Sequence, residues 1–191
     1  AYGFDDVAIV PSRRTRDPDD IDITWTLGPY RFDLPLLASA MDGVVSPRTA
    51  ALTGKLGGLG VLNLEGIWSR FENAEERLEA ISSAPKHEAT RLMQEIYAEP
   101  VKPELIAKRV EEIKETGAVV CGSLTPQKVR EYYEVAIEAG LDILVVQGTV
   151  ISAEHVSTTV EPLNLKEFIA EVPVPTIVGG CASCSTGLHL M

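Results

Sequence analysis

The chain has 191 residues, of which 45% are apolar, so it can bury a sizeable core and is not disordered as a whole. Its 17 Lys and Arg against 28 Asp and Glu give a net charge of −11, which disfavours binding to a nucleic acid polymer or to an anionic membrane. We expect a soluble cytoplasmic protein, because no apolar run reaches the roughly 18 residues of a membrane span, no signal-peptide pattern opens the chain, and three cysteines make no disulfide framework.

Residues 1–34 differ in character from the rest of the chain. They are rich in Pro, Asp and Arg and carry no long periodic run, so we interpret them as an N-terminal arm or cap rather than a core element. Within the arm, residues 13–20 are typical of a solvated loop. Residues 21–27 alternate apolar and polar side chains, which predicts a short strand.

Beyond residue 34, short apolar runs alternate with helical segments. The runs span residues 35–40, 60–62, 118–121, 143–146 and 175–178. They are nearly continuous, as in parallel strands that are covered on both faces. Residues that start and stop helices stand between them, at Ser46-Pro47 and Gly57, Pro103 and Gly117, Thr125-Pro126 and Gly140, and at Asn164. This alternation predicts a parallel sheet with right-handed crossovers.

Residues 65–102 interrupt the alternation. They are charged and have helical character, with Asn73 as an N-cap residue. The stretch is too long for an ordinary crossover between neighbouring strands. We therefore predict that it is an inserted helical segment between the second and third strands.

Five strands are compatible with two architectures. A doubly wound five-stranded sheet would be complete at this length, whereas a (β/α)8 barrel needs about 250 residues and would take only its first five strands from this chain. Counting strands does not decide between them. Residues 183–191 start like a capped helix and stop within an amphipathic turn, so we expect further chain beyond Met191.

In parallel α/β folds, functional side chains lie at the carboxyl ends of strands. Small and polar residues follow the predicted strands at positions 39–42, 63–65, 122–123, 147–149 and 179–181. Such residues let a ligand approach the backbone, but they are also ordinary turn residues of any parallel sheet.

Two further features are weaker signals. Cys181 and Cys184 form a C-x-x-C pair, which is typical of a redox pair or of half a zinc site. We disfavour both, because no second pair exists and the motif follows the fifth strand. His155 lies in the loop after the fourth strand, where an acid–base role competes with that of a solvated residue.

Several motifs together resemble the IMP dehydrogenase and GMP reductase family. They are YGFDDVAIVP at residues 2–11, LLASAMD at residues 36–42, and GGLGV at residues 57–61 after an intervening helix. PTIVGG at residues 175–180 is similar to the family's fifth strand. The resemblance covers essentially the whole chain in order, and QEIY at residues 94–97 is similar to a bacterial branch of IMP-dehydrogenase-related proteins.

The resemblance implies a (β/α)8 TIM barrel, with residues 35–191 supplying about its first five strands. It also implies a purine mononucleotide at the carboxyl-terminal mouth and NAD as hydride acceptor, or NADP in a reductase. It further implies a homo-oligomer, a tetramer in the family, and it allows a monovalent cation such as K+. The family's chemistry is hydride exchange at purine C2, to which a cysteine thiolate bonds covalently.

The residues matched to the nucleotide come from two strands. By resemblance, Ser39 and Met41 contact the nucleotide and its base, and Asp42 is expected to support their loop. Gly179 and Gly180 match the glycines that pass beneath the substrate. Cys181 occupies a position near the purine at which the family usually has Asn.

The residues matched to the nicotinamide are Gln147, Gly148 and Thr149. The family usually has Asp at the Gln147 position. Asn63 and Leu64 replace histidines that are common in the dehydrogenases. The regulatory domain pair that many dehydrogenases insert after the second strand is absent, and residues 65–102 take its place.

No catalytic residue is expected within this chain. In the family, the nucleophilic cysteine lies on the loop after the sixth strand, beyond Met191, and the phosphate-binding loops come later still. Cys181 and Cys184 lie one strand too early for that role. We therefore expect the 191 residues alone not to complete a turnover.

Three functions follow from this reasoning. The first is an oxidoreductase of IMP dehydrogenase type, which converts IMP and NAD to XMP and NADH. GMP reductase activity is the second, since a chain without the regulatory pair suits it. A non-catalytic barrel with a binding or assembly role is the alternative from another class.

Overall fold

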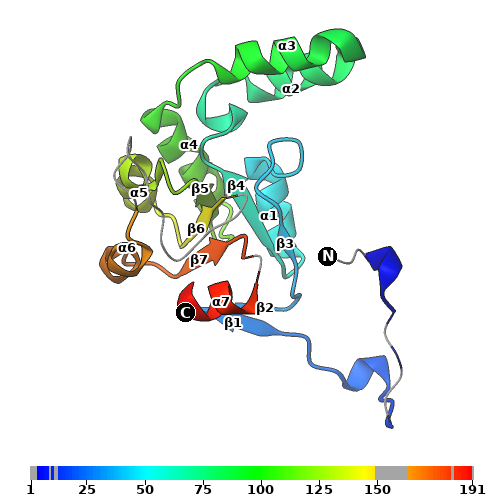
Figure 1. Ribbon diagram of the computed structural model, residues 1–191. Helices are drawn as coiled ribbons and strands as arrows, with labels where there is room; N and C mark the ends of the chain where they lie inside the picture. The colour runs from blue at the N-terminus through cyan, green and yellow to red at the C-terminus, as the bar shows by residue number, and fades with distance from the viewer. Residues whose placement is uncertain (1–3, 9, 11–12, 149–162, 182, 191) are drawn as a thin grey trace.

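The fold is built on a parallel sheet whose strands are arranged in chain order. The computed structural model describes residues 4–8, 10, 13–148, 163–181 and 183–190. The sheet has the order β3 (Leu37–Ala38), β4 (Leu59–Asn63), β5 (Cys121–Leu124), β6 (Ile143–Gln147) and β7 (Thr176–Gly179). A doubly wound sheet reverses its strand order at a switch point. The unbroken order and the curl of the sheet in Figure 1 are those of a barrel segment, which confirms the expected first five strands of a (β/α)8 barrel.

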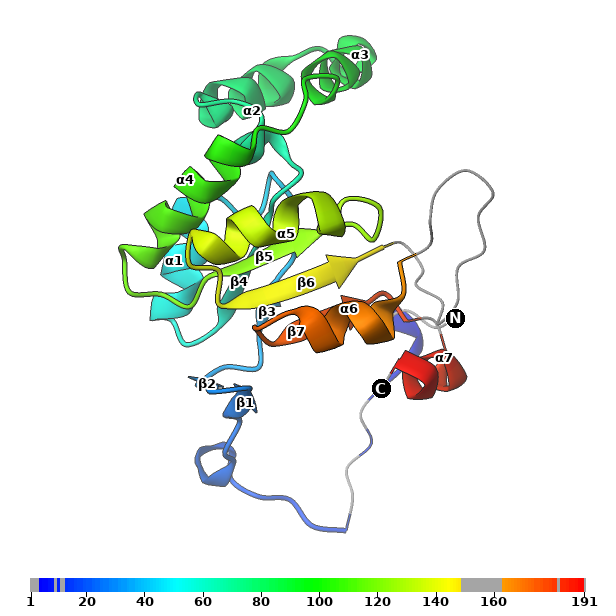
Figure 2. The ribbon, with the colours of Figure 1, turned by 90° about the vertical axis from the view of Figure 1, so that its left-hand side faces the viewer.

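Helices cover the outer side of this curved sheet. They are α1 (Pro47–Lys55), α4 (Pro103–Lys114), α5 (Val129–Glu138) and α6 (Leu165–Glu171), while α7 (Cys184–Leu190) lies beyond the end of β7. Figure 2 shows α1, α4 and α5 along one side of β4, β5 and β6, with the hairpin β1–β2 on the other. Among the described residues, no helix combines the length and apolar character required to cross a membrane.

Alternate side chains of each strand enter two separate apolar clusters. The inner cluster contains Leu59 and Val61 of β4, Cys121 of β5, and Ile143 and Val145 of β6. The outer cluster joins the intervening strand residues to the helices, and its strand members include Leu62, Leu124, Leu144 and Val146. A strand buried on both faces has to be apolar at successive positions. This is the physical reason for the nearly continuous runs in the sequence.

An antiparallel hairpin closes the inner cluster. It consists of β1 (Trp25–Leu27) and β2 (Tyr30–Phe32). Phe32 is only 4% exposed, stacks on Trp25 with ring centroids 4.4 Å apart, and belongs to the inner cluster. The expectation that residues 1–34 contribute no core element is therefore wrong for Phe32. The predicted strand at 21–27 is shorter than expected, and its pairing with β2 was not foreseen.

Several helix ends follow local signals. Ser46 is the N-cap of α1, with its Oγ accepting from Thr49 N–H at 3.1 Å and its own N–H donating to Thr49 Oγ1 at 2.7 Å. Gly57, which was predicted to end this helix, has φ +87°, a backbone conformation that residues with a Cβ atom rarely adopt. Asn164 Oδ1 likewise accepts from Glu167 N–H at the start of α6.

Two further elements begin later along the chain than predicted. The third strand of the sheet is Cys121–Leu124 rather than residues 118–121. The helix expected to open at Thr125-Pro126 begins at Val129 instead. Thr125 instead joins this turn to the loop after β4: its N–H and hydroxyl donate to the Glu65 carboxylate at 2.5 and 3.2 Å, and its carbonyl accepts from Val129 N–H at 2.9 Å.

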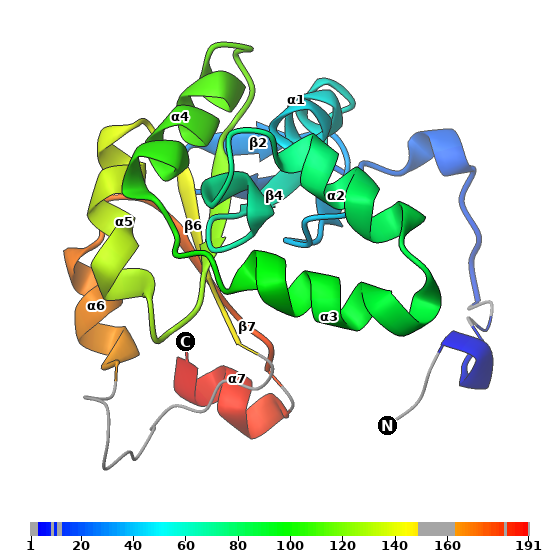
Figure 3. The same cartoon turned by 90° about the horizontal axis from the view of Figure 1, so that it is seen from above.

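The inserted segment forms two helices, α2 (Ala74–Ser83) and α3 (Lys86–Tyr97), preceded by the short 3-10 helix η3 (Ile67–Ser69). Two further 3-10 turns, η1 (Phe4–Asp6) and η2 (Pro18–Asp20), lie in the arm. Asn73 occupies the N-cap position of α2, as predicted, but its side chain donates to Glu76 Oε2 instead of capping a backbone N–H. Figure 3 shows α3 and α7 on the side toward which β6 and β7 point.

Candidate functional site

The inner face of the sheet changes from apolar to polar toward the carboxyl ends of the strands. Val61 pairs with Cys121, and two residues further along Asn63 pairs with Ser123. At the end of the next strand, Gln147 pairs with Gly179. The Ser123 hydroxyl donates to Gln147 Oε1 at 3.3 Å. The carboxyl ends of β4, β5, β6 and β7 thus form a polar mouth above an apolar barrel floor.

The structure brings the predicted nicotinamide and substrate residues together at this mouth. Gly148 N–H donates to the Gly179 carbonyl at 2.9 Å, and Gly180 N–H donates to the Gly148 carbonyl at 3.0 Å. These bonds extend the pairing of β6 and β7 past the ends of both strands. Gln147 and Gly180 are exposed, so both remain available to a ligand. Thr149 and His155 lie outside the described residues.

Gly179 leaves open space beside the backbone. A Cβ atom built at this position has no heavy atom within 4 Å. Ile177, two residues earlier on the same strand, packs in the inner cluster, so a side chain at 179 would point into the mouth. A planar ring can therefore approach the β7 backbone closely here. The residues present fit a purine or nicotinamide ring in this respect.

The loop after β3, residues 39–46, carries the other predicted substrate residues and is called the β3 loop below. Met41 N–H donates to the Ser39 carbonyl at 2.7 Å, and the Met41 carbonyl accepts from Val44 and Val45 N–H at 2.8 and 2.9 Å. Ser39 is exposed, and Met41 is 59% exposed despite being apolar. The loop therefore presents a hydroxyl and a thioether outward, in a backbone shape set by short-range bonds.

Asp42 anchors this loop, as expected for a supporting residue. It is only 8% exposed. Its Oδ2 accepts from Ile67 N–H at 3.0 Å and from the Tyr97 hydroxyl, and its carbonyl accepts from the Trp68 indole N–H at 3.4 Å. The pKa of Tyr97 is raised, first by burial and second by its hydrogen bond to the Asp42 carboxylate. The sequence contains no local signal for these partners, which lie far along the chain.

Asn63 and Leu64, at the positions where the resemblance implies histidines in the dehydrogenases, have structural partners at the end of β4. Asn63 Oδ1 accepts from Glu65 N–H at 3.1 Å. Leu64 is fully buried and lies so close to Gly122 that a Cβ there would come within 2.6 Å of it. Leu64 therefore stabilises the contact between β4 and β5, and its side chain is not directed at a ligand.

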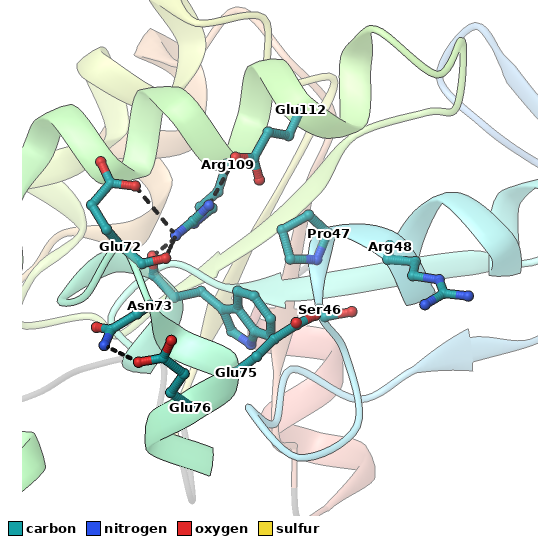
Figure 4. A pocket seen from close by; sticks show the side chains of 10 residues that line it. Ser46, Pro47, Arg48, Glu72, Asn73, Glu75, Glu76, Arg109 and Glu112 are labelled. Atoms are coloured by element: carbon teal, nitrogen blue, oxygen red, sulfur yellow. Dashed lines mark hydrogen bonds and ion pairs between the residues drawn. The ribbon is translucent and has the colours of Figure 1, made fainter. Parts of the chain in front are cut away.

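Two hollows lie beside the β3 loop. One, of about 480 Å³, is bordered by the loop and α2; its walls include Asp42, Trp68 and Leu78. The other, of about 340 Å³, is drawn in Figure 4. Arg109 of α4 points into it, but its guanidinium already donates to the Trp68 carbonyl at 3.1 Å and to Glu112 Oε1 at 2.8 Å. Neither hollow was predicted from the sequence.

All three cysteines are free thiols in the structure. Cys121 is buried in the inner cluster, and burial raises the pKa of its thiol. Cys181 and Cys184 are free and exposed, and the Cys181 thiol donates to the Ser183 carbonyl at 3.2 Å. Within the described ranges, no three His, Cys, Asp or Glu side chains are grouped as metal ligands.

Comparison with known proteins connects this geometry to a family. The family model described as IMP dehydrogenase / GMP reductase domain matches residues 1–190. An uncharacterized oxidoreductase from Mycolicibacterium smegmatis is 43% identical over 195 residues, covering 100% of this chain and 52% of that protein. An inosine-5'-monophosphate dehydrogenase from Methanocaldococcus jannaschii is 30% identical over 100 residues, covering 52% of this chain and 19% of that protein.

A solved structure has the same fold. The crystal structure of an IMP dehydrogenase/GMP reductase-like protein from Corynebacterium glutamicum superposes with a TM-score of 0.91 at 42% identity. The superposition covers 100% of this chain and 51% of that one. The chain thus spans about half the length of the relatives that it matches over its whole extent.

Proposed function

Because the chain belongs to the IMP dehydrogenase / GMP reductase family, we propose that it supplies half of the active site of a purine-nucleotide oxidoreductase of IMP dehydrogenase type. The reaction converts IMP, NAD and water to XMP, NADH and a proton. The observation that carries the proposal is the pairing of Gln147 and Gly148 with Gly179 and Gly180 at one polar mouth. Residues that the family uses for the cofactor and for the purine are neighbours there.

Each matched residue has a binding task in this proposal. The Ser39 hydroxyl hydrogen-bonds the nucleotide, and the Met41 side chain packs against its base. Gly179 and Gly180 let the purine lie against the β7 backbone, and Cys181 borders the ring. These residues bind and orient; none of them is proposed to exchange a proton or an electron pair.

Gln147 and Gly148 are proposed to form the cofactor side of the mouth, and Thr149, which lies outside the described residues, is assigned to the cofactor by resemblance alone. A nicotinamide cofactor, when bound, supplies the acceptor for the hydride that leaves purine C2. The Gln147 amide offers both a donor and an acceptor, whereas the Asp usual in the family offers acceptors alone. We propose that Gln147 contacts the nicotinamide carboxamide or ribose through these groups.

The nucleophilic cysteine is proposed to come from sequence outside these 191 residues. Cys121 is buried among apolar side chains, and the loop after β7 that holds Cys181 is proposed to border the purine rather than to attack it. The whole protein is proposed to be a cytoplasmic homo-oligomer, a tetramer by family resemblance. A monovalent cation such as K+ belongs to the same proposal for the whole protein.

GMP reductase activity is the second candidate. The described chain between β4 and α4 contains η3, α2 and α3 in place of a regulatory domain pair, and Leu64 is a packing residue where dehydrogenases commonly have histidine. Both features favour a reductase, in which GMP is the substrate and NADPH supplies the hydride.

The test uses the full-length protein that carries this segment. IMP with NAD, and separately GMP with NADPH, are followed through the absorbance of the reduced nicotinamide. We expect the absorbance to rise with the first pair if the protein is a dehydrogenase and to fall with the second if it is a reductase. No change with either pair overturns both activities. Calorimetric binding of IMP without turnover would then support the non-catalytic barrel.

A further inference from the structure

The C-terminal end of the inserted helix α3 is fastened to the β3 loop through one residue. Tyr97, the last residue of α3, donates its hydroxyl hydrogen to Oδ2 of Asp42. The same oxygen accepts from the Ile67 N–H of η3. Three segments, the β3 loop, η3 and the end of α3, therefore meet at one buried carboxylate.

Asp42 is placed to control the shape of the loop. It directly follows Met41, whose carbonyl accepts from Val44 and Val45 N–H and whose N–H donates to the Ser39 carbonyl. With its side chain drawn inward, Asp42 is 8% exposed, while the neighbouring Met41 is 59% exposed. A shift of Asp42 therefore displaces the backbone that carries both proposed nucleotide contacts.

Tyr97 is itself held in place from the other side. The Arg70 guanidinium lies 5.6 Å from the centroid of its ring and donates to its carbonyl at 3.1 Å. Arg70 also donates to the Glu65 carbonyl at 3.0 Å, in the loop after β4. The tyrosine hydroxyl is consequently directed at Asp42 by contacts on both its ring and its backbone.

We propose that Tyr97 is a positioning residue for nucleotide binding, which acts through its hydrogen bond to Asp42 on the loop that presents Ser39 and Met41. This rests on the proposed function of that loop. The inserted segment α2–α3 is then part of the substrate site. A tyrosine hydroxyl, with an ordinary pKa of about 10, is protonated at neutral pH and can donate to Asp42 there. Burial, followed by the Asp42 carboxylate, raises the pKa of Tyr97 further, so the bond persists into the alkaline range.

The experiment compares Tyr97→Phe with Tyr133→Phe in the full-length protein. Each variant removes one hydroxyl and keeps the ring; Tyr133 on α5 donates to Glu134 Oε1 at 3.0 Å and is remote from the β3 loop in sequence and fold. Amide hydrogen exchange of residues 42–45 and of Ile67 reports on the loop. The dissociation constant for IMP, from calorimetry, reports on the site.

Tyr97→Phe is expected to speed exchange at residues 42–45 and Ile67 and to weaken IMP binding by about three- to tenfold, the range expected from loss of one hydrogen bond that acts indirectly. Tyr133→Phe is expected to change neither. Unchanged exchange in Tyr97→Phe overturns the proposal, and so does faster exchange with unchanged IMP affinity. If the wild-type protein binds no purine mononucleotide, the proposed function fails, while the exchange result still decides whether Tyr97 positions the loop.

Discussion

The carboxylate of Asp42 lies directly against the Cα atom of Gly66. A Cβ atom placed on Gly66 would overlap the carboxylate carbon and both of its oxygens. Through this contact the turn after β4 packs closely against the β3 loop. It allows the Ile67 N–H, one residue further on, to reach Oδ2 of Asp42 at 3.0 Å.

Gly66→Ala is therefore expected to destabilise the protein by about 1–3 kcal/mol, because the added methyl group overlaps the Asp42 carboxylate and must displace it from its hydrogen bonds. Gly43→Ala is the matched control, since a Cβ on Gly43 meets no heavy atom within 4 Å. Denaturant unfolding of both variants measures the difference. Equal stability losses at the two positions would contradict the packing argument.

Tyr30→Phe is expected to loosen the hairpin that closes the barrel floor. Its hydroxyl donates to Asp142 Oδ1 at 2.9 Å, and Asp142 also accepts from Lys114 Nζ and from Val120 N–H. Because those two bonds remain, we expect a loss of about 0.5–1.5 kcal/mol in the free energy of unfolding. Tyr133→Phe, which removes a surface hydroxyl, should change it less. A cost no larger than that of Tyr133→Phe would show that the bond from Tyr30 to Asp142 does not help to hold the hairpin.

Cys121 makes stability depend on pH in the alkaline range. Burial raises the pKa of its thiol in the folded state, whereas the unfolded thiol ionises near its usual value of about 8.5. The unfolded state therefore releases a proton that the folded state keeps, and the free energy of unfolding falls as pH rises above about 8.5, by up to about 1.4 kcal/mol per pH unit. Tyr30 and Tyr97, whose pKa values are also raised, add to the fall above about pH 10.

The variant Cys121→Ala isolates this effect. We expect it to have a lower stability at neutral pH, because it leaves a small cavity. Between about pH 8.5 and 10 its stability should decline less steeply than that of the wild type. Denaturant unfolding in the presence of a reductant, repeated across this range, gives both slopes. Parallel curves would mean that the thiol ionises equally in both states.

Gly179→Ala is expected to separate binding from stability. Its methyl group enters open space at the mouth, so the thermal midpoint should stay close to that of the wild type. If the purine lies against β7, the same methyl group should weaken IMP binding in the full-length protein by about tenfold or more. Calorimetry with IMP and a thermal melt of the same sample provide the measurement. Undiminished affinity would place the nucleotide elsewhere in the mouth.

Sequence patterns predicted helix ends correctly where the contact that stabilises the end lies within a few residues of it. The Ser46 and Thr49 pair and the stop at Gly57 both act within one or two helical turns, and both were predicted. The third strand was misplaced because its residues include Gly122 and Ser123, which do not resemble a strand. Gly122 is required there by Leu64, which directly follows β4 and packs against Gly122.

In the candidate site, too, the sequence predicted some features, whereas others appear only in the structure. The sequence placed Ser39, Met41, Gln147, Gly179 and Gly180 at strand ends, and the structure has them there. That Gln147 pairs with Gly179 follows from the order of strands, which the sequence alone left open between two architectures. No local sequence pattern indicated the hydrogen bond from Tyr97 to Asp42, since the two residues are 55 positions apart in the chain.

The sequence by itself determined the alternation of strands and helices, most helix ends and the resemblance to a family, because these depend on periodicity and on contacts between near neighbours. The tertiary structure decided the barrel order of the sheet, the burial of Phe32 in its floor, and the bonds from Tyr97 to Asp42 and from Tyr30 to Asp142, the last across 112 residues. Such contacts form only once separate elements have packed, and packing depends on the surfaces of all of them together.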